Sequence, residues 1–298
     1  MTKEKIAFII NPKSGRGKKS DLQDLIWQNL DLEKYTPAFY VTNYAGHANI
    51  IAYQLAQSGC LKIVAVGGDG TVNEVGSALV DLDAAMGIIP CGSGNGLARH
   101  LSIPTKLADA VKYLNNTDTI RIDAGKINNT WFFCTCGVGF DACIGHQFSK
   151  LDKRGFISYI KTTIREFKNY KPKRYRFLVD GKKYKRRAFL ITIANASQYG
   201  NNAFIAPNAV IDDGLFDVCI IKPFPVIKAP VIGLKLFNGS LEKSVYSETI
   251  RGKQIRFKKP RKNYIFHYDG EPAKFKKEKI KIKMHPNCLQ IMVPKKNL

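Results

Sequence analysis

The pattern of apolar and polar positions in the first 120 residues predicts short buried strands that alternate with amphipathic helices. Continuous apolar runs, typical of buried strands, occupy 5–10, 39–42, 63–66 and 86–90. Helical spacing of apolar residues follows at 21–30, 48–57 and 72–80. This alternation predicts an α/β domain with a parallel sheet, whose loops gather at the edge where α/β folds bind ligands.

From residue 121 onward the pattern changes to β-rich segments divided by Gly, Pro and Asn. They cover 121–128, 130–136, 175–179, 185–194, 215–221, 254–257, 264–268, 279–284 and 289–293. One clear helix is expected at 156–168, and Asp180-Gly181 and Asp269-Gly270 are turn signals. We therefore expect a first domain over 1–120 and a second, mostly antiparallel β domain over 121–288.

Charge is unevenly distributed between these two parts. Residues 1–120 hold 11 basic and 11 acidic side chains, whereas residues 121–298 hold 36 basic and 13 acidic ones, so the second part carries the whole net charge of +23. Such a surface attracts anionic lipid headgroups or a nucleic-acid backbone. The alternative is a basic surface that serves solubility alone.

Three glycine-rich loops follow predicted strands, at 11–19, 67–71 and 91–99. In the central loop, glycines 67, 68 and 70 allow backbone N–H groups near a helix start to face an anion. Asp69 would repel a phosphate there unless a cation such as Mg²⁺ lay between them. The alternative is a tight left-handed turn with a helix cap at Thr71. The first loop is no Walker loop, because Pro12 and Lys19 stand where that pattern requires Gly and Ser or Thr.

The run GGDGTVNEV at 67–75 strongly resembles the nucleotide-binding signature of the diacylglycerol, sphingosine and ceramide kinase superfamily of lipid kinases, and NPKSG at 11–15 resembles the loop that opens this family. The resemblance covers nearly the whole chain. It implies that the final strand, 289–298, returns to the first domain. Arg16 and Lys18 would add positive charge near the phosphates. The implied nucleotide-binding residues are Asn11, Lys13, Ser14, Thr42, Gly67, Gly68, Asp69, Gly70, Thr71, Asn73, Glu74, Gly92 and Ser93.

The second part contains further segments of this kind. Residues 137–142, GVGFDA, match a dinucleotide fingerprint, but the βαβ unit that it requires does not follow. The resemblance implies instead that Asp141 lies near the headgroup of the acceptor lipid. Residues 211–217, IDDGLFD, would hold a structural Mg²⁺ through the Asp213 carboxylate and the carbonyls of Val210 and Leu215. An ordinary acidic hairpin turn is the alternative for this segment.

The general base is expected from the segment Asp269-Gly270-Glu271. Bacterial diacylglycerol kinases point to its glutamate, and sphingosine kinases to the aspartate of the central glycine loop. We favour Glu271 as the base and Asp69 as the Mg²⁺ anchor. Gly96 stands where diacylglycerol kinases have an acid, which is closer to the sphingosine and ceramide kinase branch, so the acceptor lipid stays open.

The sequence therefore predicts a kinase that uses Mg²⁺ and ATP to phosphorylate a hydroxyl of diacylglycerol, a sphingoid base or ceramide. Expected partners are ATP, the lipid, an anionic membrane surface and a second copy of the chain, without nucleic acid. No apolar run approaches the roughly 18 residues of a membrane span, and seven cysteines without paired spacing indicate reduced thiols, so we expect a cytoplasmic, peripherally membrane-associated protein. The alternatives are a kinase of the NAD kinase type, with a soluble acceptor, and a non-enzymatic nucleic-acid-binding protein.

Overall fold

The computed structural model of the chain describes residues 3–14, 19–148, 156–258, 265–274 and 279–295. Contacts within the chain define two compact units. Unit 1 comprises Met1–Ile122 and Asn287–Leu298, and unit 2 comprises Asp123–Pro286. Arg16 and Lys18, which were expected to add positive charge near the phosphates, lie outside the described residues.

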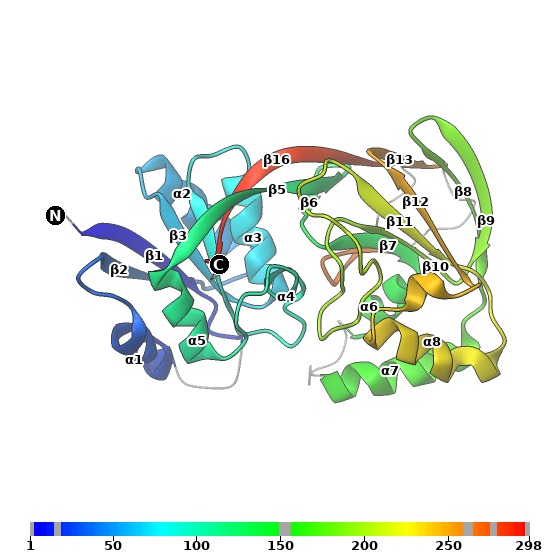
Figure 1. Ribbon diagram of the computed structural model, residues 1–298, viewed down its shortest axis with the longest axis horizontal. Coiled ribbons are helices and arrows are strands. Elements are labelled where there is room, and N and C mark those ends of the chain that lie inside the picture. The colour runs from blue at the N-terminus through cyan, green and yellow to red at the C-terminus, as the bar shows by residue number, and fades with distance from the viewer. Residues whose placement is uncertain (1–2, 15–18, 149–155, 259–264, 275–278, 296–298) are drawn as a thin grey trace. The chain divides into compact units, whose positions relative to one another are not determined.

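Unit 1 is an α/β domain with a parallel sheet in the order β2-β1-β3-β4. Its elements are β1 (Glu4–Ile10), α1 (Lys19–Asn29), β2 (Tyr35–Val41), α2 (His47–Gln57), β3 (Lys62–Gly67), α3 (Asp69–Leu79), β4 (Ala85–Pro90), α4 (Gly96–His100), α5 (Leu107–Lys112), the 3-10 turn η1 (Tyr113–Asn115) and the start of β5 (Thr117–Ile127). Helices α2 and α3 pack together on one face of this sheet, and α1 and α5 on the other (Figure 1). The strands are buried because both faces are covered, which explains their continuous apolar runs.

The last strand, β16 (Ile280–Pro294), belongs to both units. In unit 1 its second half pairs with β4 in parallel, with Ile291 beside Met86. In unit 2 its first half pairs antiparallel with β13. We expected two separate runs here, at 279–284 and 289–293, but the structure has one strand of 15 residues that includes Pro286.

Unit 2 consists of two antiparallel layers of strands and a layer of helices. Its remaining elements are β6 (Thr130–Phe132), β7 (Thr135–Gly139), α6 (Phe140–Phe148), α7 (Phe156–Asn169), β8 (Lys173–Val179), β9 (Lys182–Ala188), β10 (Leu190–Ala194), β11 (Phe216–Ile221), η2 (Val226–Lys228), α8 (Ala229–Phe237), η3 (Leu241–Lys243), β12 (Ser247–Gly252), β13 (Gln254–Phe257), β14 (Ile265–Tyr268) and β15 (Glu271–Lys274). One sheet has the order β12-β11-β10-β7-β14-β15, and β16, β13, β8 and β9 form the other layer. The α/β and antiparallel β fold classes predicted from the sequence are thereby confirmed.

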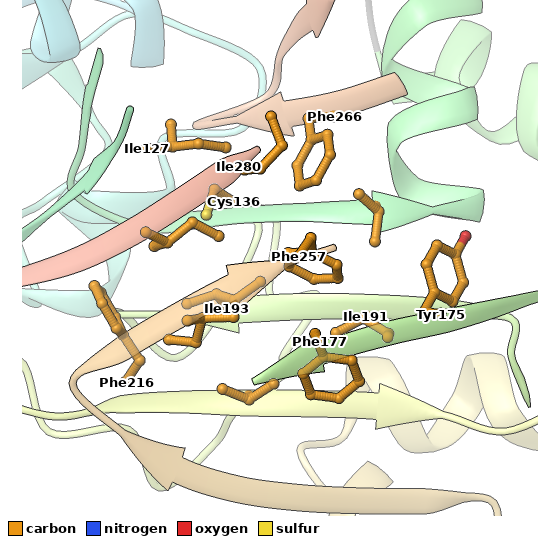
Figure 2. Packing of buried hydrophobic residues seen from close by; sticks show 14 of the residues in the cluster. Ile127, Cys136, Tyr175, Phe177, Ile191, Ile193, Phe216, Phe257, Phe266 and Ile280 are labelled. Carbon is orange, nitrogen blue, oxygen red and sulfur yellow. The ribbon is translucent and has the colours of Figure 1, made fainter. Parts of the chain in front are cut away.

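The two faces of the β7–β10–β11 sheet bury different clusters. Alternate residues such as Ile191 and Ile193 point into the core between the strand layers, where they meet Phe177 and Phe257 (Figure 2). The intervening residues point to a second cluster beneath the helices. Because this sheet is covered on both of its faces, β10 and β11 are buried at every position although they are antiparallel.

The prediction of one clear helix in the second part was wrong, because the described residues also form α6 and α8. Neither segment was assigned an element from the sequence, since the spacing of their apolar residues around Gly and Pro conceals a helical period. Two expected strands are also divided: 130–136 breaks into β6 and β7, and 185–194 into β9 and β10. Among the helices that the structure describes, none is long and apolar enough to span a bilayer.

Candidate functional site

The loops of unit 1 meet at the carboxyl edge of its parallel sheet. Asn11 follows β1, Thr42 follows β2, Gly68 follows β3 and Cys91 follows β4. The chain runs from β1 outward to β2 on one side, whereas β3 lies on the other side of β1, so the strand order reverses between β1 and β3. Such a switch point is where open α/β sheets bind ligands.

Asn11 joins the first loop to the central one. Its side-chain amide donates a hydrogen bond to the Thr71 hydroxyl at 3.0 Å, and its side-chain oxygen accepts the backbone N–H of Lys13 at 3.0 Å. The backbone N–H of Ser14 donates to the Asn11 carbonyl at 3.1 Å. These bonds hold the turn in which Lys13 is exposed, beside the start of α3.

The central and third loops are in direct backbone contact at Gly68 and Gly92. A Cβ atom on Gly92 would lie 2.6 Å from the Gly68 Cα, and one on Gly68 would lie 3.2 Å from the Gly92 Cα. A Cβ on Gly67 would lie 2.4 Å from the Thr71 hydroxyl oxygen. None of these glycines is in the left-handed region, so the alternative of a left-handed turn is wrong. Glycine is required here for close approach between segments.

Asp69 is the first residue of α3, so the helix begins three residues before the expected start at residue 72, and Gly70 is helical. The Asp69 carboxylate also orders the third loop. Oδ2 accepts the backbone N–H of Asn95 at 2.9 Å, and Oδ1 accepts that of Gly96 at 2.7 Å, at the start of α4.

The third loop is further closed by Asn95, whose φ is +54°. Its side-chain oxygen accepts the Gly92 N–H at 2.9 Å, and its amide donates to the Gly92 carbonyl at 2.8 Å. Ser93 is exposed within this loop. Burial raises the pKa of the Cys91 thiol to about 11, so this cysteine is a neutral thiol and no thiolate nucleophile.

Glu74 supports the loop after β2. Its two carboxylate oxygens accept the backbone N–H groups of Gly46 at 2.8 Å and Ala48 at 3.1 Å, at the start of α2. Thr42 is buried in this loop, 7% exposed, and its N–H donates to the Ile10 carbonyl at 2.9 Å. Asn73, one residue before Glu74, accepts a hydrogen bond from Ser77 at 3.4 Å. Glu74 therefore holds the backbone at the start of α2 in place. A contact between Glu74 and a nucleotide stays a prediction.

The residues around Asp69 fit a magnesium ion that arrives with a nucleotide. Asp69 supplies one carboxylate at the carboxyl edge of the sheet, beside the glycine loops. Within the described part of the chain, no three His, Cys, Asp or Glu residues are grouped as a metal site. A single carboxylate suits Mg²⁺, which proteins commonly bind through one or two carboxylates together with substrate phosphates.

In unit 2, Asp141 is at the centre of a buried polar network. Its Oδ2 accepts hydrogen bonds from the hydroxyls of Thr192 at 2.8 Å and Tyr199 at 3.1 Å, and lies 2.9 Å from Nε2 of His267. Oδ1 accepts the N–H of Ala142 at 2.8 Å. The side chains of Asp141 and His267 are 8% and 4% exposed.

The register of the sheet explains this network. Gly137 on β7 pairs with Thr192 on β10 and with His267 on β14, so the three residues form one row across the sheet. A Cβ atom on Gly137 would lie 3.1 Å from both Asp141 Oδ2 and His267 Nε2. The first glycine of the GVGFDA segment therefore leaves space for the carboxylate. β7 has only antiparallel partners, so no βαβ dinucleotide unit forms here.

The environment of Asp141 favours its ionised form. Burial alone would raise the pKa of this carboxyl, but the charge and hydrogen bond of His267 and the bonds from Thr192 and Ala142 outweigh it, so the pKa is lowered. The carboxylate already has four partners within unit 2. Contact between Asp141 and a lipid headgroup stays a prediction.

His267 leads directly into the hairpin that carries the expected base. Asp269, with φ +42°, accepts the N–H groups of Phe133, Cys134 and Thr135 at 2.8, 2.8 and 3.1 Å. Glu271 follows at the start of β15, opposite Tyr268, and is exposed. The acid before the glycine is thus an anchor, and the acid after it faces solvent.

Asp213 is paired with an arginine side chain. Its Oδ2 forms an ion pair with Arg251, whose Nε also lies 3.2 Å from Asp217, and its Oδ1 accepts the Leu215 N–H at 3.0 Å. Val210 is 48% exposed. The residues as they stand do not fit a structural Mg²⁺ unless the ion displaces the guanidinium, so this role of Asp213 with the Val210 and Leu215 carbonyls stays a prediction.

Asn95 lies in the third glycine loop that the sequence singled out, but its hydrogen bonds to Gly92 were not expected. Thr192, Tyr199 and His267 carry no local pattern of their own. His267 lies on β14, and Asp269 lies in the turn that follows this strand. Their partners, 126 to 136 residues away, depend on strand pairing.

The loops at the switch point and the antiparallel second unit define a class of kinase, and comparison with known proteins assigns the chain to it. Residues 5–127 match the diacylglycerol kinase catalytic domain, and residues 134–293 match the YegS C-terminal NAD kinase beta sandwich-like domain. The chain belongs to this family of lipid kinases.

Its relatives are consistent with that assignment. A diacylglycerol kinase of Bacillus subtilis is 30% identical over 72% of this chain and 73% of its own. A Serratia proteamaculans protein named "Probable lipid kinase YegS-like" is 28% identical over 96% of this chain and 93% of its own.

Solved structures show the same fold. A diacylglycerol kinase from Bacillus anthracis superposes with a TM-score of 0.75 at 22% identity, and the match covers 98% of each chain. Yeast NADH kinase superposes with a TM-score of 0.51 at 10% identity, covering 99% of this chain and 85% of its own. The NAD kinase alternative therefore shares the fold, whereas the family is that of the lipid kinases.

Proposed function

We propose that the protein transfers the γ-phosphoryl group of ATP to the hydroxyl of diacylglycerol, with sphingoid bases and ceramide as the alternative acceptors. The observation that carries this proposal is the set of Gly68, Gly92 and Asp69 at the switch point of unit 1, where two glycine loops meet backbone to backbone and the Asp69 carboxylate binds N–H groups of the third loop. The names of the relatives support diacylglycerol as acceptor.

In this reaction the bond between the γ-phosphorus and the β,γ-bridging oxygen breaks, and a bond from that phosphorus to the lipid oxygen forms. ADP leaves, and the hydroxyl proton passes to a carboxylate. Backbone N–H groups of the glycine loops and exposed Lys13 would bind the phosphates. Mg²⁺ held by Asp69 would neutralise phosphate charge.

Glu271 is the proposed general base. It is exposed, and it follows a turn that Asp269 anchors through three backbone N–H groups. Asp69 is less suited to accept a proton, because both of its oxygens already accept N–H groups. A base with fewer fixed partners is freer to reach the acceptor hydroxyl, which favours Glu271.

The test has two parts. Labelled ATP with Mg²⁺ is offered to diacylglycerol, sphingosine, ceramide and NAD in separate reactions, and we expect label on diacylglycerol. Glu271→Gln should lower kcat by about 10²- to 10⁴-fold with little change in ATP affinity, the usual contribution of a general base. Asp69→Asn should weaken Mg²⁺-ATP binding as well. Label on NAD alone would refute the lipid acceptor, and near-normal kcat in Glu271→Gln would move the base to Asp69.

A further inference from the structure

The segment 226–245 of unit 2 carries the most exposed apolar side chains in the described chain. It contains six of the fourteen exposed large hydrophobic residues, among them the three most exposed. They are Val226 at 73%, Ile227 at 83%, Val231 at 46%, Leu234 at 67%, Phe237 at 45% and Val245 at 82%. A concentration of this kind marks an interaction surface, because soluble surfaces normally expose large apolar residues singly.

Helix α8 is apolar on two opposite sides. Ile232 and Leu236, one turn apart, pack against the cluster beneath the sheet. Leu234 and Phe237 project from the other side and are exposed. In unit 2 the helix lies in the outer layer, beyond β10 and β11 (Figure 1). A helix that is apolar all round is typical of a protein interior or a membrane, and no residue of α8 is buried.

Two contacts place the residue after Val245 beside the chain that leads into η2. The Lys222 N–H donates to the Tyr246 carbonyl at 2.7 Å, and the rings of Tyr246 and Phe224 lie 5.9 Å apart. The exposed apolar residues therefore come from η2, from α8 and from the chain just before β12.

The charges of this segment favour an anionic partner. Between residues 226 and 245 the basic residues are Lys228, Lys235 and Lys243, and the single acid, Glu242, accepts a hydrogen bond from Asn208 at 2.7 Å. Long basic side chains beside apolar residues suit a bilayer interface, where their stems lie along the apolar layer and their ammonium groups reach the headgroups. A two-fold contact between copies would instead bring the same lysines together.

We propose that residues 226–245 form a membrane-docking face. Ile227, Leu234 and Val245 insert into the boundary between headgroups and acyl chains of an anionic bilayer, and the three lysines bind headgroup phosphates. This inference goes beyond the kinase reaction. It rests on the proposed function only for the reason to dock, since the proposed acceptor lies in a bilayer.

The test is sedimentation with vesicles of phosphatidylcholine alone and of phosphatidylcholine with phosphatidylglycerol. The variant is Ile227→Ser with Leu234→Ser, and the matched control is Ile50→Ser with Leu61→Ser, which removes the same residue types at 45% and 58% exposure from unit 1. We expect the variant to bind the anionic vesicles at least about ten-fold more weakly, because burying one such side chain is worth roughly a ten-fold change. The control should bind as the wild type does.

High salt distinguishes insertion of the apolar side chains from electrostatic attraction between the lysines and the headgroups. Raising the ionic strength screens exposed lysines within a few ångströms, so the wild-type binding that persists at 1 M salt comes from insertion and should be lost in the variant. Equal binding by variant and wild type would overturn the proposal. A wild-type dimer that the variant converts to a monomer, with vesicle binding unchanged, would overturn it in favour of a second copy.

Vesicle binding is measured without ATP or turnover, so the docking face and the kinase reaction can be refuted independently. If the variant loses vesicle binding while the wild type labels none of the lipids, the docking face stands and the proposed reaction fails. If the wild type labels diacylglycerol while variant and wild type bind vesicles equally, the reaction stands and the docking face fails.

Discussion

Replacing Asp141 with alanine should destabilise unit 2 strongly. The substitution removes the acceptor of the Thr192 and Tyr199 hydroxyls and the partner of His267 Nε2, and all three groups remain near a site with almost no solvent. It also leaves the Ala142 N–H at the start of α6 without its acceptor. The loss therefore exceeds that of one surface interaction.

The magnitude follows from these contacts. Leaving a buried polar group without its hydrogen-bond partner costs about 1–3 kcal/mol, and more where the lost partner is charged. The hydroxyls of Thr192 and Tyr199 are within hydrogen-bonding distance of each other, so one hydrogen bond between them remains after the substitution. We expect a loss of about 3 kcal/mol, which corresponds to a fall in unfolding temperature of about 6–12 °C for a domain of 150–250 residues.

The two tryptophans provide an assay that reports each unit. Trp27 lies in α1 of unit 1 and is 47% exposed, whereas Trp131 lies in β6 of unit 2. In a Trp27→Phe background, urea unfolding followed by fluorescence reports unit 2 alone. Asp118→Ala, at an exposed carboxylate, is the control and should change the unfolding free energy by no more than about 0.5 kcal/mol.

The effect should depend on pH in a defined direction. The pKa of Asp141 is lowered in the folded protein, so its stabilising effect is complete above the unfolded pKa of about 3.9 and is lost as the pH falls through the lower, folded pKa. The stability difference between wild type and Asp141→Asn should therefore shrink as the pH falls below about 4. A loss under 1 kcal/mol in Asp141→Ala, or an Asn difference that grows towards low pH, would refute the reasoning.

Two further substitutions test the loops. Gly92→Ala would bring a methyl group to 2.6 Å from the Gly68 Cα, so the two loops must separate, and we expect ATP affinity measured by calorimetry to fall by at least about ten-fold with the unfolding of unit 2 unchanged. Arg251→Ala leaves the carboxylates of Asp213 and Asp217 without their shared cation and should cost about 1 kcal/mol, since the guanidinium is half exposed. Millimolar Mg²⁺ should then restore part of the loss in a thermal unfolding assay, and no response to Mg²⁺ would argue against a divalent site there.

The classes of structure in this protein could be predicted from the order of its residues. Continuous apolar runs before glycine loops predicted the parallel sheet, because strands covered on both faces need apolar residues at every position. Turn residues and short β-rich segments predicted the antiparallel part. The family signature at 67–75 also led to Asp69 and to the loops around it, since a ligand site built from consecutive residues is visible as a local pattern.

The contacts of individual residues could not be predicted in this way, because they depend on how distant segments pack. The row of Thr192, Gly137 and His267 arises from strand pairing between segments 55 to 130 residues apart, which no local pattern specifies. Glu74 and Asp269 were expected from their motifs, but their carboxylates bind distant backbone N–H groups. The outward face of α8 was hidden for a related reason: burial depends on what packs against a helix, and its apolar residues alone do not tell which side stays uncovered.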